Sequence, residues 1–261
     1  MARTPEGPPP APAVQKLRLR YAKRGRLRFS SHRDFQRSFE RALRRAGVPM
    51  AYSAGFTPHP KVSYAGAAPT GVASEAEYVE IGVVERLDPE RVRAALDASL
   101  PDGLDVIEVV EAGPGGLPER LEASVWEVRL DGVTEEEAFA ALERFLAADR
   151  VEVERLTKTG PRTFDARQAV VRAAVVDPAT SHDAAAASGA GTASCAILRL
   201  VVRHMTPAVR PDDVLSGLRR VADLAPPSPP AVVRLAQGPL VEPEGTVADP
   251  LSPDRDAVGA G

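Results

Sequence analysis

The residues best suited to chemistry lie in a short segment, residues 52–61 (YSAGFTPHPK). Its histidine, His59, stands between Pro58 and Pro60, with Lys61 two residues further on. Each proline fixes its own φ and favours extended backbone at the residue before it, so the segment would hold His59 at little entropic cost. An imidazole can transfer protons near neutral pH. We therefore regard His59 as a candidate general acid or base, although the same prolines would also suit a rigid strand entry. The residues expected to shape this loop are Ser53, Gly55, Phe56, Pro58 and Pro60.

A second candidate group is formed by Ser31, His32 and Asp34, which combine a hydroxyl, an imidazole and a carboxylate. Three residues within four positions cannot easily form a hydrolase relay, whose members usually come from distant parts of a chain. Ser31 and Asp34 instead suit the N-cap and the third position of a helix. His32 lies towards the edge of the apolar face of that helix. It becomes a second catalytic candidate if helix and loop bring it close to His59.

Cofactor binding by this chain alone is not expected. Cys195 is the single cysteine, which excludes a disulfide, a multi-cysteine zinc site and an intrachain iron–sulfur cluster. Two histidines, His32 and His59, together with Asp34 form only a weak set of metal ligands, because their geometry is not defined by the sequence. We therefore predict no metal site.

The predicted helix 32–46 carries an arginine-rich face. Four arginines cluster opposite its apolar stripe at about 100° per residue: Arg33, Arg37, Arg41 and Arg44. Planar guanidinium groups suit phosphate oxygens because each can donate two parallel hydrogen bonds. Arg45 and Lys61 are further candidates for binding an anion. The alternative is a solvated surface helix with Asp34 and Glu40 as its only local counterions.

The charge of the chain is strongly asymmetric. Residues 16–61 contain 13 Lys and Arg against two acids, a local charge of +11, whereas the whole chain carries −3. A basic block favours a polyanionic partner such as RNA, unless the acidic remainder folds against it. Aromatic residues make up only 5% of the chain, and the basic block offers Phe29 and Tyr52 without the aromatic signature of an RNA-recognition motif. The composition therefore predicts recognition of backbone and shape, without sequence-specific base stacking.

The elements that position these residues follow from hydrophobic periodicity. In the first half, the pattern predicts a strand at 16–22, whose alternation resumes at 26–29 after a turn at Gly25. It also predicts strands at 62–66, 77–84 and 104–110, and helices at 32–46 and 88–99. In the second half, it predicts strands at 124–130, 151–157, 169–176, 196–205 and 231–236, and helices at 134–148 and 211–222. The order β-α-β-β-α-β is ferredoxin-like. We therefore predict an α+β fold of two tandem ferredoxin-like domains.

The domain limits follow from composition. We predict a disordered segment 1–14, a basic ferredoxin-like domain 15–112, an acidic ferredoxin-like domain 122–237 with a low-complexity loop 179–194, and a disordered tail 238–261. No apolar run approaches the roughly 20 residues of a membrane span. The N-terminus lacks the apolar core of a secretory signal. We therefore expect a cytoplasmic protein without membrane association.

Several motifs together resemble the radical-SAM-linked protein family, over roughly residues 15–240. The segments that carry the resemblance are Ser30-Ser31-His32-x-Asp34, Phe39-x-Arg41-Ala42-x-Arg44-Arg45-Ala46, Tyr52-Ser53-x-Gly55-Phe56-x-Pro58-His59-Pro60-Lys61, Ser74-Glu75-x-Glu77-Tyr78 and, more weakly, Phe164-Asp165-Ala166-Arg167. The resemblance implies a domain of unknown function that is often fused to, or encoded beside, a radical SAM enzyme. This chain lacks the radical SAM part and its cluster cysteines, so a partner would have to supply those cofactors.

These observations lead to three hypotheses. The first is an accessory, non-catalytic protein of a radical SAM enzyme that binds RNA or another phosphate-rich partner through the basic face. The second is a stand-alone, metal-free RNA-processing or transferase enzyme, with His59 as general acid or base and Lys61 or Arg45 stabilising charge. The third is a structural subunit whose basic face docks an acidic protein. The absence of a complete nucleophile–base motif favours the first.

Overall fold

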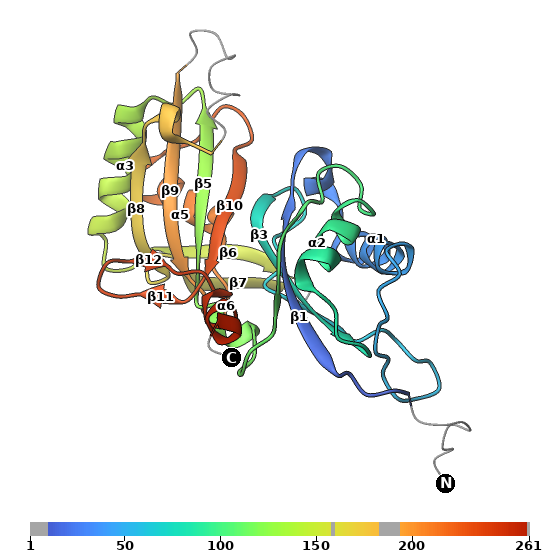
Figure 1. The fold of residues 1–261 in the computed structure, drawn as a ribbon. Helices are drawn as coiled ribbons and strands as arrows, with labels where there is room; N and C mark the ends of the chain where they lie inside the picture. Colours follow the sequence, from blue (N-terminus) through green and yellow to red (C-terminus); the bar gives the residue numbers. More distant parts are fainter. Residues whose placement is uncertain (1–9, 158–159, 183–193, 260–261) are drawn as a thin grey trace. The chain divides into compact units, whose positions relative to one another are not determined.

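The computed structural model describes residues 10–157, 160–182 and 194–259, which form an α+β protein of two compact units (Figure 1). The first unit comprises Met1–Arg120 together with Pro250–Gly261, and the second comprises Leu121–Asp249. The chain thus passes from one unit to the other after Arg120 and returns to the first unit at its C-terminal end.

The first unit is built on an antiparallel sheet. Its elements are β1 (Gln15–Lys23), the 3₁₀ helix η1 (Gly25–Phe29), α1 (His32–Arg45), β2 (Val62–Ala65), β3 (Ala73–Val83), α2 (Pro89–Asp97), β4 (Val106–Glu111), the 3₁₀ helix η2 (Pro118–Arg120) and α6 (Ser252–Gly259). Strand β1 pairs with β4 and β3, and β3 also pairs with β2, so these strands lie in the order β4-β1-β3-β2. The main chain up to β4 follows the order β-α-β-β-α-β.

The strand alternation predicted to resume at residues 26–29 is wrong, because this segment forms η1. Gly25 has φ +53°, which turns the chain directly after β1. The N–H of Leu27 then donates to the carbonyl of Arg24, and the N–H of Ser30 to that of Leu27. These local hydrogen bonds therefore form a turn of 3₁₀ helix, although the polar–apolar alternation favours a strand. The turn leads the chain into α1.

Two helices of the first unit begin where the sequence predicts. The Ser31 side chain accepts a hydrogen bond from the N–H of Asp34, which caps α1. The Asp88 side chain accepts from the N–H groups of Glu90 and Arg91 and caps α2, with Pro89 at its first position. Each cap satisfies backbone donors that have no partner within the helix, a contribution of about 1 kcal/mol.

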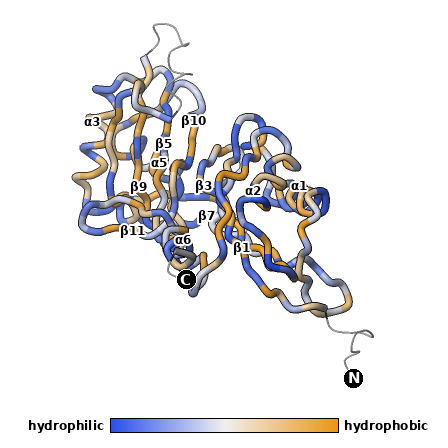
Figure 2. Tube along the Cα trace, in the orientation of Figure 1, coloured by the Kyte–Doolittle hydropathy of each residue, from blue (hydrophilic) through white to orange (hydrophobic). Residues whose placement is uncertain are grey.

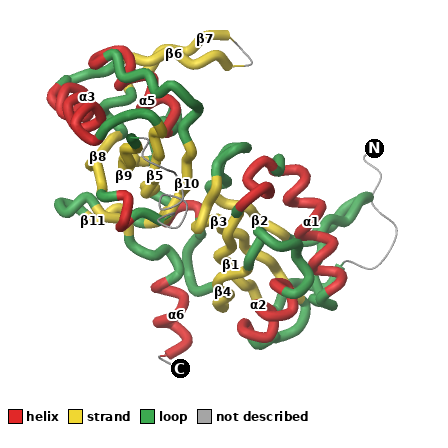
Figure 3. Tube along the Cα trace, turned by 90° about the horizontal axis from the view of Figure 1, so that it is seen from above, coloured by secondary structure: helices red, strands yellow, loops and turns green. Residues whose placement is uncertain are grey.

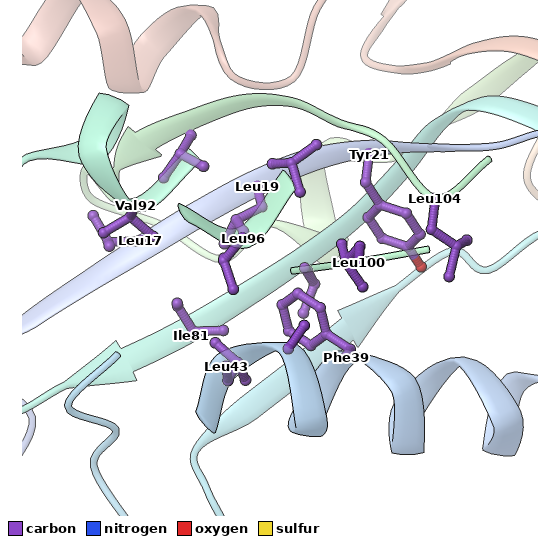
Figure 4. Packing of buried hydrophobic residues seen from close by; sticks show 14 of the residues in the cluster. Leu17, Leu19, Tyr21, Phe39, Leu43, Ile81, Val92, Leu96, Leu100 and Leu104 are labelled. Atoms are coloured by element: carbon purple, nitrogen blue, oxygen red, sulfur yellow. The ribbon is translucent and has the colours of Figure 1, made fainter. Parts of the chain in front are cut away.

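Alternation along β1 directs its apolar side chains to one face of the sheet. Leu17, Leu19 and Tyr21 join a buried core with apolar residues of α1 and α2, among them Phe39 and Leu96. Figure 4 shows these side chains converging between the strands and the helices. The aromatic rings of Tyr21 and Phe35 stack with centroids 4.4 Å apart, and Phe35 continues to Phe39 at 5.6 Å. The apolar stripe of α1 is thus held against the sheet, which directs its opposite face outward.

The predicted disorder of residues 238–261 is wrong for the part of the tail that the structure describes. This part contains β11 (Leu240–Val241), β12 (Thr246–Val247) and α6. Leu251 and Asp254 are completely buried in the first unit. Composition misled the prediction because the tail has few large apolar residues, whereas hydrogen bonds and ion pairs of the tail, such as those of Asp254 with Arg18 and Arg120, also attach it.

The second unit is also built on an antiparallel sheet. Its elements are β5 (Ala123–Asp131), α3 (Glu135–Ala147), β6 (Glu152–Thr157), β7 (Gly160–Asp165), β8 (Val170–Val176), the 3₁₀ helix η3 (Pro178–Thr180), β9 (Cys195–Arg203), α5 (Pro211–Ala222) and β10 (Ala231–Gly238), followed by β11 and β12. The strands pair in the order β10-β5-β9-β8. Hydrophobic residues recur along β5 and β9 (Figure 2). The capping box predicted at Thr134 and Glu137 is confirmed.

Strands β6 and β7 pair with each other as a separate hairpin, which projects from the second unit (Figure 3). Strand β7 was not predicted as such, because its sequence, GPRTFD, lacks the alternation of a half-buried strand. Most of the predicted low-complexity loop 179–194, namely 183–193, lies outside the described residues, as do residues 1–9 of the predicted N-terminal disordered segment.

Candidate functional site

The outward face of α1 carries Arg33, Arg37, Arg41 and Arg44, which we call the arginine face. All four side chains are exposed. None of them forms an ion pair with any residue that the structure describes. The hydrogen bond that the Ser31 hydroxyl donates to the Asp34 carboxylate (2.6 Å) holds the pKa of Asp34 below its ordinary value, and the charges of Arg37 and Arg33 act in the same direction. The arginine face is thus available to an external anion.

The other two predicted anion ligands lie differently. Arg45 is exposed, and its Nη1 donates to the carbonyl of Ser99 at 3.0 Å, so part of its guanidinium is engaged within the unit. Lys61 is exposed and directly precedes β2, where its N–H donates to the carbonyl of Ala51 at 2.7 Å. Its ammonium group contacts no carboxylate among the described residues. Lys61 therefore carries a charge at the end of the loop that no described carboxylate pairs.

The loop that contains His59 is closed by hydrogen bonds at its base. The N–H of Ser53 donates to the carbonyl of His59 at 2.8 Å, and the N–H of His59 donates to Oγ of Ser53 at 3.0 Å. Tyr52 and Pro60 form an isolated antiparallel bridge. Gly55 has φ +135°, a conformation that glycine adopts most readily, and Phe56 follows it at the exposed end. The loop therefore has a defined conformation, which Ser53 stabilises.

The two candidate catalytic histidines are not in contact. The ring of His32 lies edge-on against Tyr64, with centroids 5.0 Å apart, and its Nε2 is 3.0 Å from Nε2 of Gln36. The ring of His59 is exposed and makes no hydrogen bond or ring contact with the described residues. Within the described ranges, no second polar side chain is hydrogen-bonded to the His59 ring to orient its imidazole.

The exposure of His59 leads to a first prediction. His59→Ala is expected to change the melting temperature by less than about 2 °C. Substitutions at exposed positions usually change the free energy of unfolding by no more than about 0.5 kcal/mol. The measurement is thermal unfolding followed by circular dichroism, with Phe35→Ala as a destabilised control from the core. A loss of more than about 2 kcal/mol would show that His59 packs in the folded protein.

Sequence reasoning missed a buried ion network on the opposite face of the first unit's sheet. Arg18, 2% exposed, donates from Nε to Glu80 at 2.9 Å and from Nη1 to Asp254 at 2.8 Å. Asp254 also accepts from Nη1 of Arg120 at 2.9 Å and from the N–H of Gly113 at 2.8 Å. The alternation of β1 places Arg18 on the face opposite the core, but only the return of α6 shows that this face is buried.

A cavity of about 430 Å³ opens beside this network, lined by residues of β1, β2 and β3 and of the segment 113–118. Its charged groups already neutralise one another, since Glu80 accepts from both Arg18 and Lys16 (each 2.9 Å). The hydroxyl of Tyr64 is buried and has no hydrogen-bond partner among the described residues, and burial raises the pKa of Tyr64. The ion pairs thus account for the charged groups of this cavity, whereas the Tyr64 hydroxyl is left without a partner among the described residues.

The second unit contains a serine–histidine pair. Oγ of Ser124 lies 2.7 Å from Nε2 of His204, whose Nδ1 lies 2.7 Å from the carbonyl oxygen of Leu121. Burial lowers the pKa of His204, which favours the neutral imidazole. Ser124, however, is completely buried, so its hydroxyl cannot meet a substrate. The pair connects β5 to the end of β9 and has no exposed nucleophile.

Two further features bear on the class of protein. The described residues contain no group of three or more His, Cys, Asp or Glu arranged to hold a metal ion. Among the helices within the described ranges, none combines the length and apolarity needed to cross a membrane.

Fold and site together define an α+β protein of two units with an exposed arginine face on the first helix. The chain belongs to the family described as "Uncharacterized protein conserved in bacteria (DUF2344)", which matches residues 16–211. This match covers α1, the His59 loop and most of both units. No curated protein matches the chain. The family description does not mention a radical SAM enzyme, so that association stays a prediction.

Proposed function

We propose that this protein binds RNA, or another phosphate-rich partner, through the arginine face and serves as an accessory protein of a radical SAM enzyme. The observation that carries the proposal is the exposure of four arginines on one helix face without an ion pair to any described residue. Like charges three or four residues apart destabilise a helix by about 0.2–0.5 kcal/mol per pair. A bound polyanion would relieve this repulsion, since each guanidinium can donate two hydrogen bonds to a phosphate.

We further propose that both units are ferredoxin-like domains. The order of elements and the strand orders β4-β1-β3-β2 and β10-β5-β9-β8 support this assignment, the hairpin β6–β7 being an insertion in the second unit. A ferredoxin-like fold does not by itself imply a function, so the proposal of RNA binding depends on the arginine face.

The radical SAM partner is supported by the motif resemblance alone. The test is affinity purification of the tagged full chain from its native cells, followed by mass spectrometry. Recovery of a radical SAM protein that survives a high-salt wash supports the association. Its absence, when other proteins are recovered reproducibly, contradicts it. The alternative, an enzyme that uses His59, has less support because no described side chain orients the His59 ring.

Charge reversal on the arginine face is expected to remove RNA binding. Arg37→Glu combined with Arg41→Glu leaves the apolar stripe of α1 unchanged, so the variant should fold as the parent does. Binding of a fluorescent oligoribonucleotide, followed by anisotropy, should become undetectable at moderate salt. If residual binding can be measured at low salt, the negative slope of log K against log [salt] should become shallower by about 1.4. This change corresponds to two lost phosphate contacts on a single strand.

The matched control is Arg219→Glu combined with Arg220→Glu. These arginines are exposed in the last turn of α5 and form no ion pair with a described residue, and the change in net charge is the same. Binding of this control should stay within about threefold of the parent, because it makes the same change in net charge and leaves the arginine face intact. Equal binding by parent and α1 variant at low salt would refute the proposal.

A further inference from the structure

Exposed aromatic rings precede and follow the arginine face in the sequence. Phe56 is 70%, Phe29 59% and Tyr52 41% exposed. The chain is only 5% aromatic, and of the large hydrophobic side chains exposed in the described ranges, a single other aromatic, Phe139, lies elsewhere. Phe29 precedes the first turn of α1, whereas Tyr52 and Phe56 follow its last turn. Three of the four exposed aromatic side chains in the described ranges thus lie in the segments before and after α1.

Phe29 is held in a defined position although most of its surface is exposed. The guanidinium carbon of Arg28 lies 4.7 Å from the centroid of the Phe29 ring. The N–H of Gly71 donates to the carbonyl of Arg28 at 2.8 Å, and a Cβ on Gly71 would lie 4.0 Å from Cε1 of the ring. A cation thus stacks on the ring and backbone lies at its edge. A nucleobase can stack on the exposed part of the Phe29 ring. The positive charge of Arg28 would strengthen binding of a nucleotide, because its base carries a phosphate.

Phe56 is presented by the closed loop described above. The paired hydrogen bonds between Ser53 and His59 fix the base of this loop. Lys61 is exposed at its end and forms no ion pair with a described residue. A flexible loop could fold an apolar ring back onto the protein surface, whereas this closed loop keeps the ring in water. An exposed ring beside an exposed ammonium group matches the two components of a nucleotide, its base and its phosphate.

We infer that the arginine face binds single-stranded nucleic acid, with the backbone along α1 and bases stacked on Phe29 and Phe56. This inference rests on the proposed function and specifies the form of its ligand. Bases in a duplex are stacked on one another and cannot reach the two rings, whereas unpaired bases can. Every base has a π-face, so the rings select strandedness with little sequence preference. The composition predicted recognition without sequence-specific stacking, and the exposure of the rings adds stacking that is independent of sequence.

The experiment compares Phe29→Ala and Phe56→Ala in the full chain. The probes are a labelled single-stranded oligoribonucleotide of about 12 nucleotides, the same sequence as a duplex, and an abasic chain of equal length. Each variant should bind the single strand about tenfold more weakly, with an unchanged salt slope because no phosphate contact is lost. Neither substitution should alter binding of the duplex or of the abasic chain. Phe139→Ala, which removes a 54% exposed ring from α3, is the matched control and should bind like the parent.

The outcomes separate this inference from the proposed function. If the arginine variant loses binding and both phenylalanine variants bind the single strand like the parent, the proposed function stands and the stacking inference is refuted. The stacking inference would also be refuted if the phenylalanine variants lost as much affinity for the abasic chain as for the single strand, because the rings would then act without bases. If the parent binds no probe, both proposals fail. Phe56→Leu keeps an apolar side chain without a π-face, so a loss as large as that of Phe56→Ala identifies stacking, and full binding by Phe56→Leu contradicts it.

Discussion

Asp254→Ala is expected to lower the free energy of unfolding by about 3 to 5 kcal/mol, because it removes one partner from a buried ion network. The Asp254 carboxylate accepts hydrogen bonds from Arg18, Arg120 and the N–H of Gly113, and it is completely buried. Its removal leaves the Arg18 guanidinium, 2% exposed, with Glu80 as its remaining carboxylate partner. The destabilisation arises because a buried charge that loses a partner is incompletely compensated in the folded state.

Urea unfolding followed by circular dichroism measures this effect. Asp256→Ala is the matched control, since Asp256 lies on the same helix and is exposed. It should change the free energy of unfolding by less than about 0.5 kcal/mol. If Asp254→Ala were no more destabilising than Asp256→Ala, α6 would contribute little to the first unit.

The destabilisation caused by Asp254→Ala is expected to depend on pH. Burial acts to raise the pKa of Asp254, but hydrogen bonds from Arg120, Gly113 and Arg18 outweigh it, and the folded-state pKa is lower than the ordinary value. A carboxyl group with a lowered pKa in the folded state stabilises the protein above its unfolded-state pKa, about 3.9, and loses this contribution as the pH falls through the folded-state value. The difference between parent and Asp254→Ala should therefore shrink below about pH 4.

Phe39→Ala is expected to lower the free energy of unfolding by about 3 to 5 kcal/mol through a cavity in the core. Phe39 is 1% exposed and lies between Phe35 and Tyr64, with ring centroids at 5.6 and 6.4 Å. This ring is part of the apolar stripe that holds α1 against the sheet. The substitution should therefore also weaken the proposed RNA binding, since the arginine face is positioned by that stripe.

Phe139→Ala is the control for this substitution, because it removes a ring of the same kind from an exposed position. Its change in the free energy of unfolding should stay within about 0.5 kcal/mol. Urea unfolding of both variants provides the comparison. A loss below about 1 kcal/mol for Phe39→Ala would mean that α1 is not anchored through this ring.

The sequence by itself determined the local elements around the candidate site. A helical repeat of Phe35 and Phe39, with arginines on the opposite side, predicts α1 and its two faces, because both follow from a period of 3.6 residues. The caps at Ser31 and Asp88 were equally predictable, since a side-chain oxygen one position before a helix can satisfy a free N–H. Such features depend on neighbours in the chain and need no knowledge of distant contacts.

Only the tertiary structure decided which charges are paired and which rings are exposed. Arg18 and Arg33 are both arginines of the basic block, yet the first is buried against Asp254, 236 residues away, and the second is exposed. Phe29 and Phe56 appear in the sequence as ordinary apolar residues, and nothing in their spacing indicates exposure. Burial of a side chain depends on which segments of the chain return to cover it, and contacts between residues so far apart in sequence leave no local pattern to read.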